Sequence, residues 1–151
     1  MNTSRREFIK EMGALGMARW TPSKLTVQAA DVPLQRLAAE KGLLFGSCLA
    51  LKYFVQSAAY QQLFLSQCDI ATPEVHMKWN SLSNQPGIYD FSSADKFVTF
   101  CATNRIRVRA HTLVWHDALP AWVTSQLTAA NGQAIMTDHI TKVAGHFAGK
   151  V

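Results

Sequence analysis

The sequence has few of the features that mark a membrane, disordered or nucleic-acid-binding protein. No apolar run approaches the ~20 residues that a membrane-spanning helix needs. Charged residues make up 17% of the 151 residues and hydrophobic residues 48%, a balance that favours a chain with a buried core over a disordered one. We therefore expect one globular domain and no membrane span.

The net charge of +5 is concentrated near the amino terminus. Residues 1–29 hold five basic residues against Glu7 and Glu11, which leaves a balance of +2 over residues 30–151. That longer part has no basic stripe with interleaved aromatic residues, so we expect no nucleic-acid partner.

Cysteine is scarce, and no close pair or metal-ligand spacing occurs. The three cysteines are Cys48, Cys68 and Cys101. The histidines at positions 76, 111 and 116 lack metal-site spacing too, so we predict no metal ion and no cofactor. Cys101 falls on the expected buried face of a helix, where a free thiol acts as a small apolar group, although one disulfide remains open.

The amino terminus resembles a twin-arginine export signal. Residues 4–10 (SRREFIK) place two arginines before an apolar residue and a lysine. A short apolar stretch follows at 12–18, and residues 27–29 (VQA) offer compact side chains for cleavage. We predict that 1–29 is a signal peptide for export to the periplasm or the medium. The alternative is the basic tail of a cytoplasmic protein.

Strand and helix patterns alternate along the rest of the chain. Segments that favour buried strands are 43–49, 69–74 and 107–115. Helical segments are 53–67, 92–104 and about 137–149. Three βα units of a parallel sheet are the natural interpretation. The first strand lacks the glycine-rich phosphate loop of a doubly wound domain, and a (β/α)8 barrel needs ~250 residues. The predicted fold class is therefore α/β, a partial (β/α)8 TIM barrel of about three units.

Finer expectations concern the helices and the third strand. Ser92 is expected to cap its helix, with Asp95 three residues on. The expected buried positions are Ala94, Phe97, Val98, Cys101 and Ala102 in that helix and Ile140, Val143, Ala144 and Phe147 in the last one. Alternation in the third strand places His111 and Trp115 on one face and His116 on the other.

Several motifs carry a resemblance to a known family. They are Pro73–Trp79 (PEVHMKW), Pro86–Phe91 (PGIYDF), Arg109–His116 (RAHTLVWH) and Leu119–Trp122 (LPAW). In this order and spacing they resemble the amino-terminal part of a glycoside hydrolase family 10 xylanase. The resemblance begins near residue 37, so residues 30–151 are predicted to be the truncated amino-terminal part of that family's catalytic domain.

The resemblance implies a barrel that cleaves β-1,4-xylan internally with retention of configuration. A retaining glycosidase uses two carboxyl groups about 5–5.5 Å apart, which in this family are glutamates after the fourth strand and on the seventh. The chain ends where the fourth strand is expected, so we expect it to carry neither glutamate and to be inactive alone. Glu74 and Asp117, on different strand ends, are not expected to substitute for them.

The residues that carry over by the resemblance belong to the glycone side of the cleft. Glu74 accepts hydrogen bonds from sugar hydroxyls, Lys78 donates one, His111 supplies another and Trp115 presents its ring to a sugar. Trp79 is expected to pack in support of Lys78, and His116 is a scaffold residue or a ligand. The alternatives are that Glu74 is an ordinary solvated or ion-paired carboxylate and Lys78 a surface lysine. For His111 and Trp115 the alternative is packing in the core.

Val75 departs from the family pattern. Many members have an asparagine at this position, whose amide binds a sugar hydroxyl, and valine offers no such bond. The loss at such a subsite is on the order of 1 kcal/mol. The preference between xylan and a related β-1,4-glycan therefore stays open.

An unpaired sheet edge is expected where a fourth strand would lie, and exposed parallel edges invite association. The isolated chain is therefore expected to be unstable or to pair with the rest of its barrel. Two classes remain open: a xylanase that is incomplete or complemented by its remainder, and a non-catalytic xylan-binding or truncated gene product.

Overall fold

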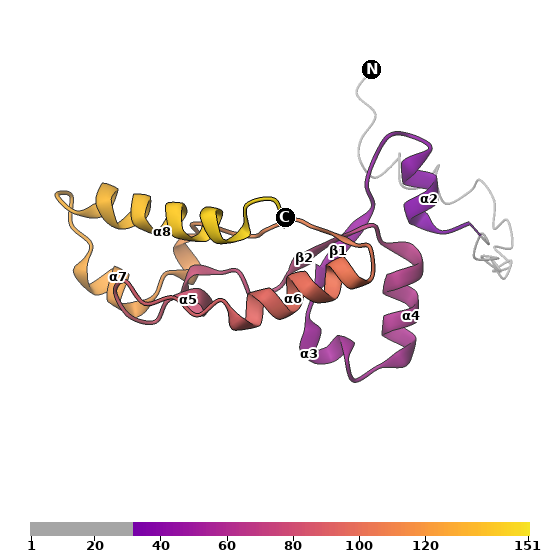
Figure 1. The fold of residues 1–151 in the computed structure, drawn as a ribbon, viewed down its shortest axis with the longest axis horizontal. Helices are drawn as coiled ribbons and strands as arrows, with labels where there is room; N and C mark the ends of the chain where they lie inside the picture. Colours follow the sequence, from indigo (N-terminus) through magenta and orange to yellow (C-terminus); the bar gives the residue numbers. More distant parts are fainter. Residues whose placement is uncertain (1–31) are drawn as a thin grey trace, which may run out of the picture. The chain divides into compact units, whose positions relative to one another are not determined.

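The residues that the structure describes contain a parallel three-stranded sheet in the order β1-β2-β3, of which β1 and β2 are labelled in Figure 1. The strands are β1 (Gly46–Leu49), β2 (Ile70–Pro73) and β3 (Arg107–Val108). The register pairs Gly46 with Ile70 and Ala71 with Val108. This computed structural model describes residues 32–151, so the predicted signal peptide lies outside the described residues.

Helices connect the strands in the expected alternation. Helix α2 (Leu34–Ala39) precedes β1, α3 (Leu51–Phe54) and α4 (Ala58–Gln67) lead to β2, and α5 (Trp79–Leu82) and α6 (Ser92–Thr103) lead to β3. The chain continues through a 3-10 turn, η1 (His116–Ala118), α7 (Ala121–Gln126) and α8 (Gly132–Phe147). The fold is therefore α/β with parallel strands, as predicted for part of a (β/α)8 barrel.

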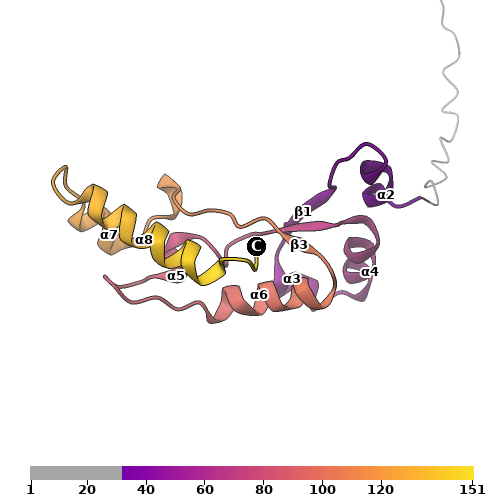
Figure 2. The same cartoon turned by 45° about the horizontal axis from the view of Figure 1, so that its top comes forward.

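One face of the sheet is covered by α3, α4 and α6, which lie on the same side of the strands (Figure 2). The buried cluster there comprises Leu49, Phe54, Phe64, Cys68, Ala71, Phe97, Cys101 and Ile106. The opposite face, which a closed barrel would enclose, carries exposed Cys48 beside half-buried Thr72. The expectation of a buried first strand is therefore wrong for Gly46–Cys48, which are exposed, and only Leu49 is buried.

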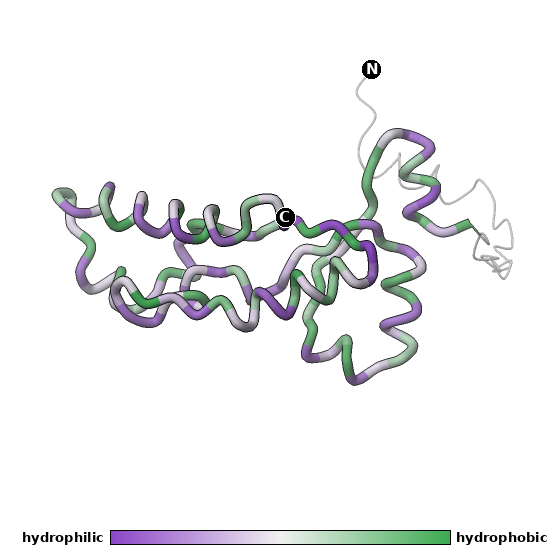
Figure 3. The backbone as a smooth tube through the Cα atoms, viewed as in Figure 1, coloured by the Kyte–Doolittle hydropathy of each residue, from purple (hydrophilic) through white to green (hydrophobic). Residues whose placement is uncertain are grey.

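A second buried cluster joins the end of β2 to α6 and α8. It comprises Met77, Leu82, Ala94, Val98, Val143 and Phe147. Hydrophobic and hydrophilic stretches alternate along α8, as expected of a helix with one packed side (Figure 3). This cluster fixes the position of α8 against the segment that follows β2.

Gly46 permits the close approach of β1 and β2. A Cβ built at this glycine would lie 2.0 Å from the backbone oxygen of Ile70, far inside any permitted contact. Only glycine therefore fits where the first strand begins.

Several expected boundaries and contacts are corrected by the structure. The helix predicted over 53–67 is two helices, α3 and α4, separated at 55–57. The predicted strand 107–115 pairs only at Arg107–Val108, and the remainder runs without a strand partner among the described residues. Three residues predicted to be buried are exposed: Ala102, Ile140 and Ala144. On α8 the buried face passes through His139, Val143 and Phe147 instead.

The amino-terminal cap of α6 also differs from the prediction. The Asp90 carboxylate accepts a hydrogen bond from the Ser92 backbone N–H at 2.8 Å, so Asp90, and not Ser92, satisfies the first turn. Asp95 instead bonds Nε2 of His146 on α8 at 2.7 Å, which ties the two helices together.

Candidate functional site

Candidate sugar-binding residues lie just beyond the carboxyl ends of the strands. Glu74 follows β2 directly, and its backbone N–H donates to the Leu49 carbonyl at the end of β1 (3.3 Å). Lys78 precedes α5, and residues 111–115 follow the short β3. This is the face on which barrel enzymes assemble their active sites.

Lys78, Trp115 and His111 form one group of side chains. The Lys78 Nζ lies 4.7 Å from the centroid of the Trp115 ring, a cation–π contact. The ring of His111 lies 6.5 Å from that of Trp115, tilted by 47°. Trp115 keeps 38% of its surface exposed, so part of this residue is accessible to a ligand. Sequence alternation predicted that His111 and Trp115 lie near each other, although the strand on which that prediction relied ends at Val108.

Glu74 and Lys78 also belong to one electrostatic environment, together with Cys48. Partial burial raises the pKa of the Cys48 thiol, the charge of Glu74 raises it further, and Lys78 lowers it. No ion pair within residues 32–151 holds the exposed Glu74 carboxylate. Its oxygens are therefore free to accept hydrogen bonds from polar groups of a ligand.

His116 also adjoins Trp115, their ring centroids lying 6.1 Å apart with the ring planes at 85°. The His116 imidazole bonds the neighbouring Asp117 carboxylate at 3.2 Å, and both side chains are largely in solvent, 81% and 60% exposed. His116 therefore contacts both Trp115 and Asp117, and its two expected roles, scaffold residue and ligand, both stay predictions.

Trp79 packs as the sequence predicted. It is 3% exposed, and its ring stacks on that of His139 with centroids 3.8 Å apart and planes 10° from parallel. The edge of Trp122 contacts it from another side at 6.3 Å. Trp79 begins α5 immediately after Lys78, so its burial fixes the backbone from which the lysine extends.

His139, which the sequence analysis did not select, connects three segments. This fully buried histidine on α8 bonds the Leu113 carbonyl through Nε2 (2.8 Å) and the Tyr89 hydroxyl through Nδ1 (3.2 Å). Burial lowers the pKa of His139, against smaller raising effects of the Leu113 bond and of Asp138. Burial also raises the pKa of Tyr89 to about 12. The imidazole of His139 is therefore neutral, and it lies between the Leu113 carbonyl and the Tyr89 hydroxyl.

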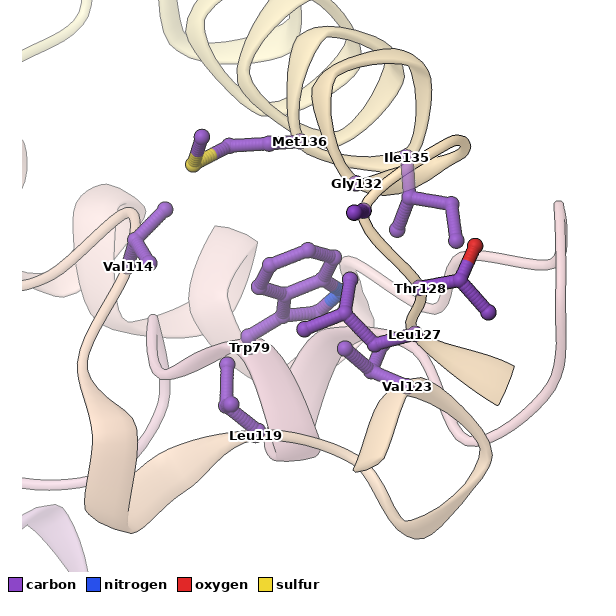
Figure 4. A pocket seen from close by; sticks show the side chains of 10 residues that line it. Trp79, Val114, Leu119, Val123, Leu127, Thr128, Gly132, Ile135 and Met136 are labelled. Carbon is purple, nitrogen blue, oxygen red and sulfur yellow. The ribbon is translucent and has the colours of Figure 1, made fainter. Parts of the chain in front are cut away.

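A cavity of about 490 Å³ lies beside Trp79, between α7 and the start of α8 (Figure 4). Its walls are apolar side chains, among them Val114, Val123, Leu127 and Met136. None of Glu74, Lys78, His111 and Trp115 lines it. Because a sugar presents hydroxyls that need polar partners, we place the candidate site at the Lys78–Trp115 group and not in this cavity.

Two further observations concern residues 32–151. Within them, no cluster of three or more acidic, histidine or cysteine side chains could hold a metal ion. The helices in this part are all too short or too polar to span a bilayer.

Comparison with known proteins places this geometry in a family. The sequence profile of glycosyl hydrolase family 10 matches residues 33–151. The chain belongs to glycosyl hydrolase family 10. A β-1,4-xylanase of Dictyoglomus thermophilum is 41% identical over 92 residues, covering 61% of this chain and 26% of that protein. Endo-1,4-beta-xylanase B of Thermotoga neapolitana is 34% identical over 124 residues, covering 80% of this chain and 36% of the relative.

Solved structures of the family share the fold. Xylanase 10B of Thermotoga petrophila RKU-1, crystallised with xylobiose, superposes with a TM-score of 0.73 at 33% identity, over 80% of this chain and 38% of that one. Native xylanase 10B of Thermotoga maritima gives 0.72 at 33% identity, with the same coverage. The partial barrel is therefore confirmed, and the chain spans well under half the length of these family 10 relatives.

Proposed function

We propose that residues 32–151 bind one side of a β-1,4-xylan chain, as part of a retaining endo-1,4-β-xylanase. The observation that carries the proposal is the Lys78 cation 4.7 Å from the half-exposed Trp115 ring, with His111 alongside, at the carboxyl ends of parallel strands. Support comes from relatives that are xylanases and from a structural neighbour that holds xylobiose.

Each residue has a role that its chemistry fits. The apolar face of Trp115 packs on a sugar ring, and the Lys78 ammonium donates to a hydroxyl. The Glu74 carboxylate accepts from hydroxyls, and the His111 imidazole adds one further polar contact. Val75, which is exposed beside Glu74, offers no hydrogen bond and leaves that part of the sugar solvated.

Hydrolysis is proposed to need carboxyl groups that this chain does not supply. A retaining mechanism requires an acid/base and a nucleophile on opposite sides of one glycosidic bond. Glu74 has a binding role in our proposal, and Asp117 is occupied with His116. We therefore expect this chain to be catalytic only when the remainder of the barrel complements it, and we propose that remainder as its protein partner.

Binding and hydrolysis are tested separately on the purified chain. Titration with xylohexaose, followed by calorimetry, is expected to show binding that Trp115→Ala abolishes. Cellohexaose, a β-1,4-linked hexasaccharide of glucose in place of xylose, serves as the matched control ligand. Release of reducing sugar from xylan by the chain alone would contradict the catalytic part of the proposal, and absent xylohexaose binding would contradict the binding part.

A second candidate function is a non-catalytic, xylan-binding product, which the same exposed Trp115 ring favours. The codons that follow Val151 separate the two: an open reading frame supports the enzyme, and a stop codon supports the binding product. In either case we propose export through residues 1–29, on the evidence of the SRREFIK segment.

A further inference from the structure

We infer that His139 is a positioning residue that holds the segment 111–115 in its sugar-binding conformation. This inference rests on the proposed function, because it concerns the segment that presents His111 and Trp115. It adds a residue of α8, 24 positions beyond Trp115, to those that determine sugar binding.

The bond to Leu113 carries the argument. Leu113 is the middle residue of the segment, and its carbonyl accepts from His139 Nε2 at 2.8 Å. Beyond β3 this stretch has no strand partner within the described residues, so side-chain contacts must fix its path. Leu113 itself is exposed, and its side chain cannot anchor the segment by burial.

The tautomer follows from the partners. A backbone carbonyl only accepts, so Nε2 must carry the proton, and Nδ1 is then the acceptor for the Tyr89 hydroxyl at 3.2 Å. Both ring nitrogens are thereby satisfied in the neutral form. A fully buried imidazole with each nitrogen engaged has one orientation, as a positioning group requires.

The ring plane of His139 is fixed as well. It stacks on Trp79 at 3.8 Å, and Trp79 directly follows Lys78. The face of the His139 ring therefore contacts Trp79, the neighbour of Lys78. Its edge bonds Leu113, which belongs to the same segment as Trp115. This places the two halves of the Lys78–Trp115 contact in a fixed mutual position.

The first test needs no variant and no sugar. In the ¹⁵N spectrum of the 151-residue chain, His139 is expected as the Nε2–H tautomer with a slowly exchanging proton. The Nδ1–H tautomer, or a rapidly exchanging ring proton, would overturn the inference.

The second test uses three substitutions and the indole N–H signal of Trp115, assigned by its loss in Trp115→Phe. His139→Phe keeps a stacking ring but no donor, and it is expected to shift the Trp115 signal and weaken xylohexaose binding roughly fivefold, the effect of one neutral hydrogen bond. His139→Gln restores a donor and is expected to recover most of both. Tyr89→Phe removes only the bond to Nδ1 and leaves the Leu113 bond intact, so a smaller change than that of His139→Phe is expected in both measurements.

The outcomes distinguish this inference from the proposed function. If the unmodified chain does not bind xylohexaose, the proposed function fails, and the Trp115 signal in His139→Phe still decides whether His139 positions the segment. An unshifted Trp115 signal in a folded His139→Phe chain would overturn the inference. So would an affinity loss that follows the melting temperature equally in all three variants, because that result indicates a purely structural role.

Discussion

The Lys78 ammonium stands 4.7 Å above the Trp115 ring, although 37 positions separate the two residues in the sequence. Lys78 reaches this position from the residue that precedes α5, and Trp115 from the chain beyond β3. A cation in this position sets a charged hydrogen-bond donor beside the aromatic surface on which a sugar would lie. In our proposal the pair is the part of the site where the polar and apolar surfaces of a sugar are recognised together.

Removing this cation is expected to weaken sugar binding. Lys78→Met keeps most of the side-chain length and loses the charged donor, so xylohexaose affinity is expected to fall about tenfold, the effect of a charge-assisted hydrogen bond. Calorimetry measures the change. Lys52→Met is the matched control, because Lys52 also lies over a ring, that of Tyr53 at 5.7 Å, outside the site. Equal affinities of the two variants would contradict the role of Lys78.

Gly46 provides a test of the sheet. Gly46→Ala would place a methyl group 2.0 Å from the Ile70 oxygen, so the free energy of unfolding is expected to fall by at least about 2 kcal/mol. Gly145→Ala is the control: this glycine lies within α8 with no atom within 4 Å of its added Cβ, and a gain of about 0.5–1 kcal/mol is expected. Urea unfolding followed by circular dichroism measures both. A Gly46→Ala chain as stable as the unmodified one would refute the close approach.

The sequence predicted where the residues of local motifs lie, while their contacts with a sugar stay a proposal. Glu74 and Lys78 were predicted from a short motif that ends a strand, and their backbone lies there. His111 and Trp115 were correctly expected near each other, but the predicted strand is too long, because its pairing with β2 ends at Val108. Alternation identifies an extended chain, and whether that chain pairs depends on neighbours elsewhere in the fold.

His139 shows what the sequence could not specify. The expected buried face of the last helix ran through Ile140, whereas the structure buries the residue before it. An imidazole tolerates full burial only when its nitrogens have partners. Those partners, the Leu113 carbonyl and the Tyr89 hydroxyl, lie 26 and 50 positions away, so no helical pattern could reveal them.

The three thiols are expected to differ in reactivity. The Cys101 thiol is fully buried, which raises its pKa to about 11, and burial followed by the charge of Asp69 raises the pKa of buried Cys68. Cys48 is exposed. The pKa of Cys48 is raised too, so its exposure distinguishes it, and a disulfide reagent at pH 7.5 is expected to modify Cys48 rapidly and the two buried thiols at least about 100-fold more slowly.

Cys48→Ser identifies the fast thiol, since it should abolish the rapid phase and leave the slow one. In guanidinium chloride the unmodified chain should react at all three thiols. A count of one in the unfolded chain would instead reveal a disulfide, which is absent from the described residues, where all three cysteines are free.

The neutral state of His139 predicts how stability depends on pH. Burial holds the pKa of His139 below its ordinary value of 6.5, so the unfolded chain binds the proton more readily than the folded chain. The stabilisation is complete above pH 6.5 and is lost as the pH falls from there through the folded-state pKa. His76, whose pKa burial also lowers, contributes in the same direction. The free energy of unfolding should therefore fall between pH 7 and pH 5.

The contribution of His139 itself is isolated by comparison with His139→Gln, which has no titrating group. The stability advantage of the unmodified chain over this variant is expected to shrink as the pH decreases, and urea unfolding at pH 7.5, 6.5 and 5.5 measures it. His76→Gln, measured in parallel, accounts for the second histidine. An advantage that grows toward acid would mean that His139 takes up its proton on folding. A charged imidazole would then have no free lone pair at Nδ1 to accept from Tyr89, and the hydrogen-bond arrangement described for Leu113 and Tyr89 would be wrong.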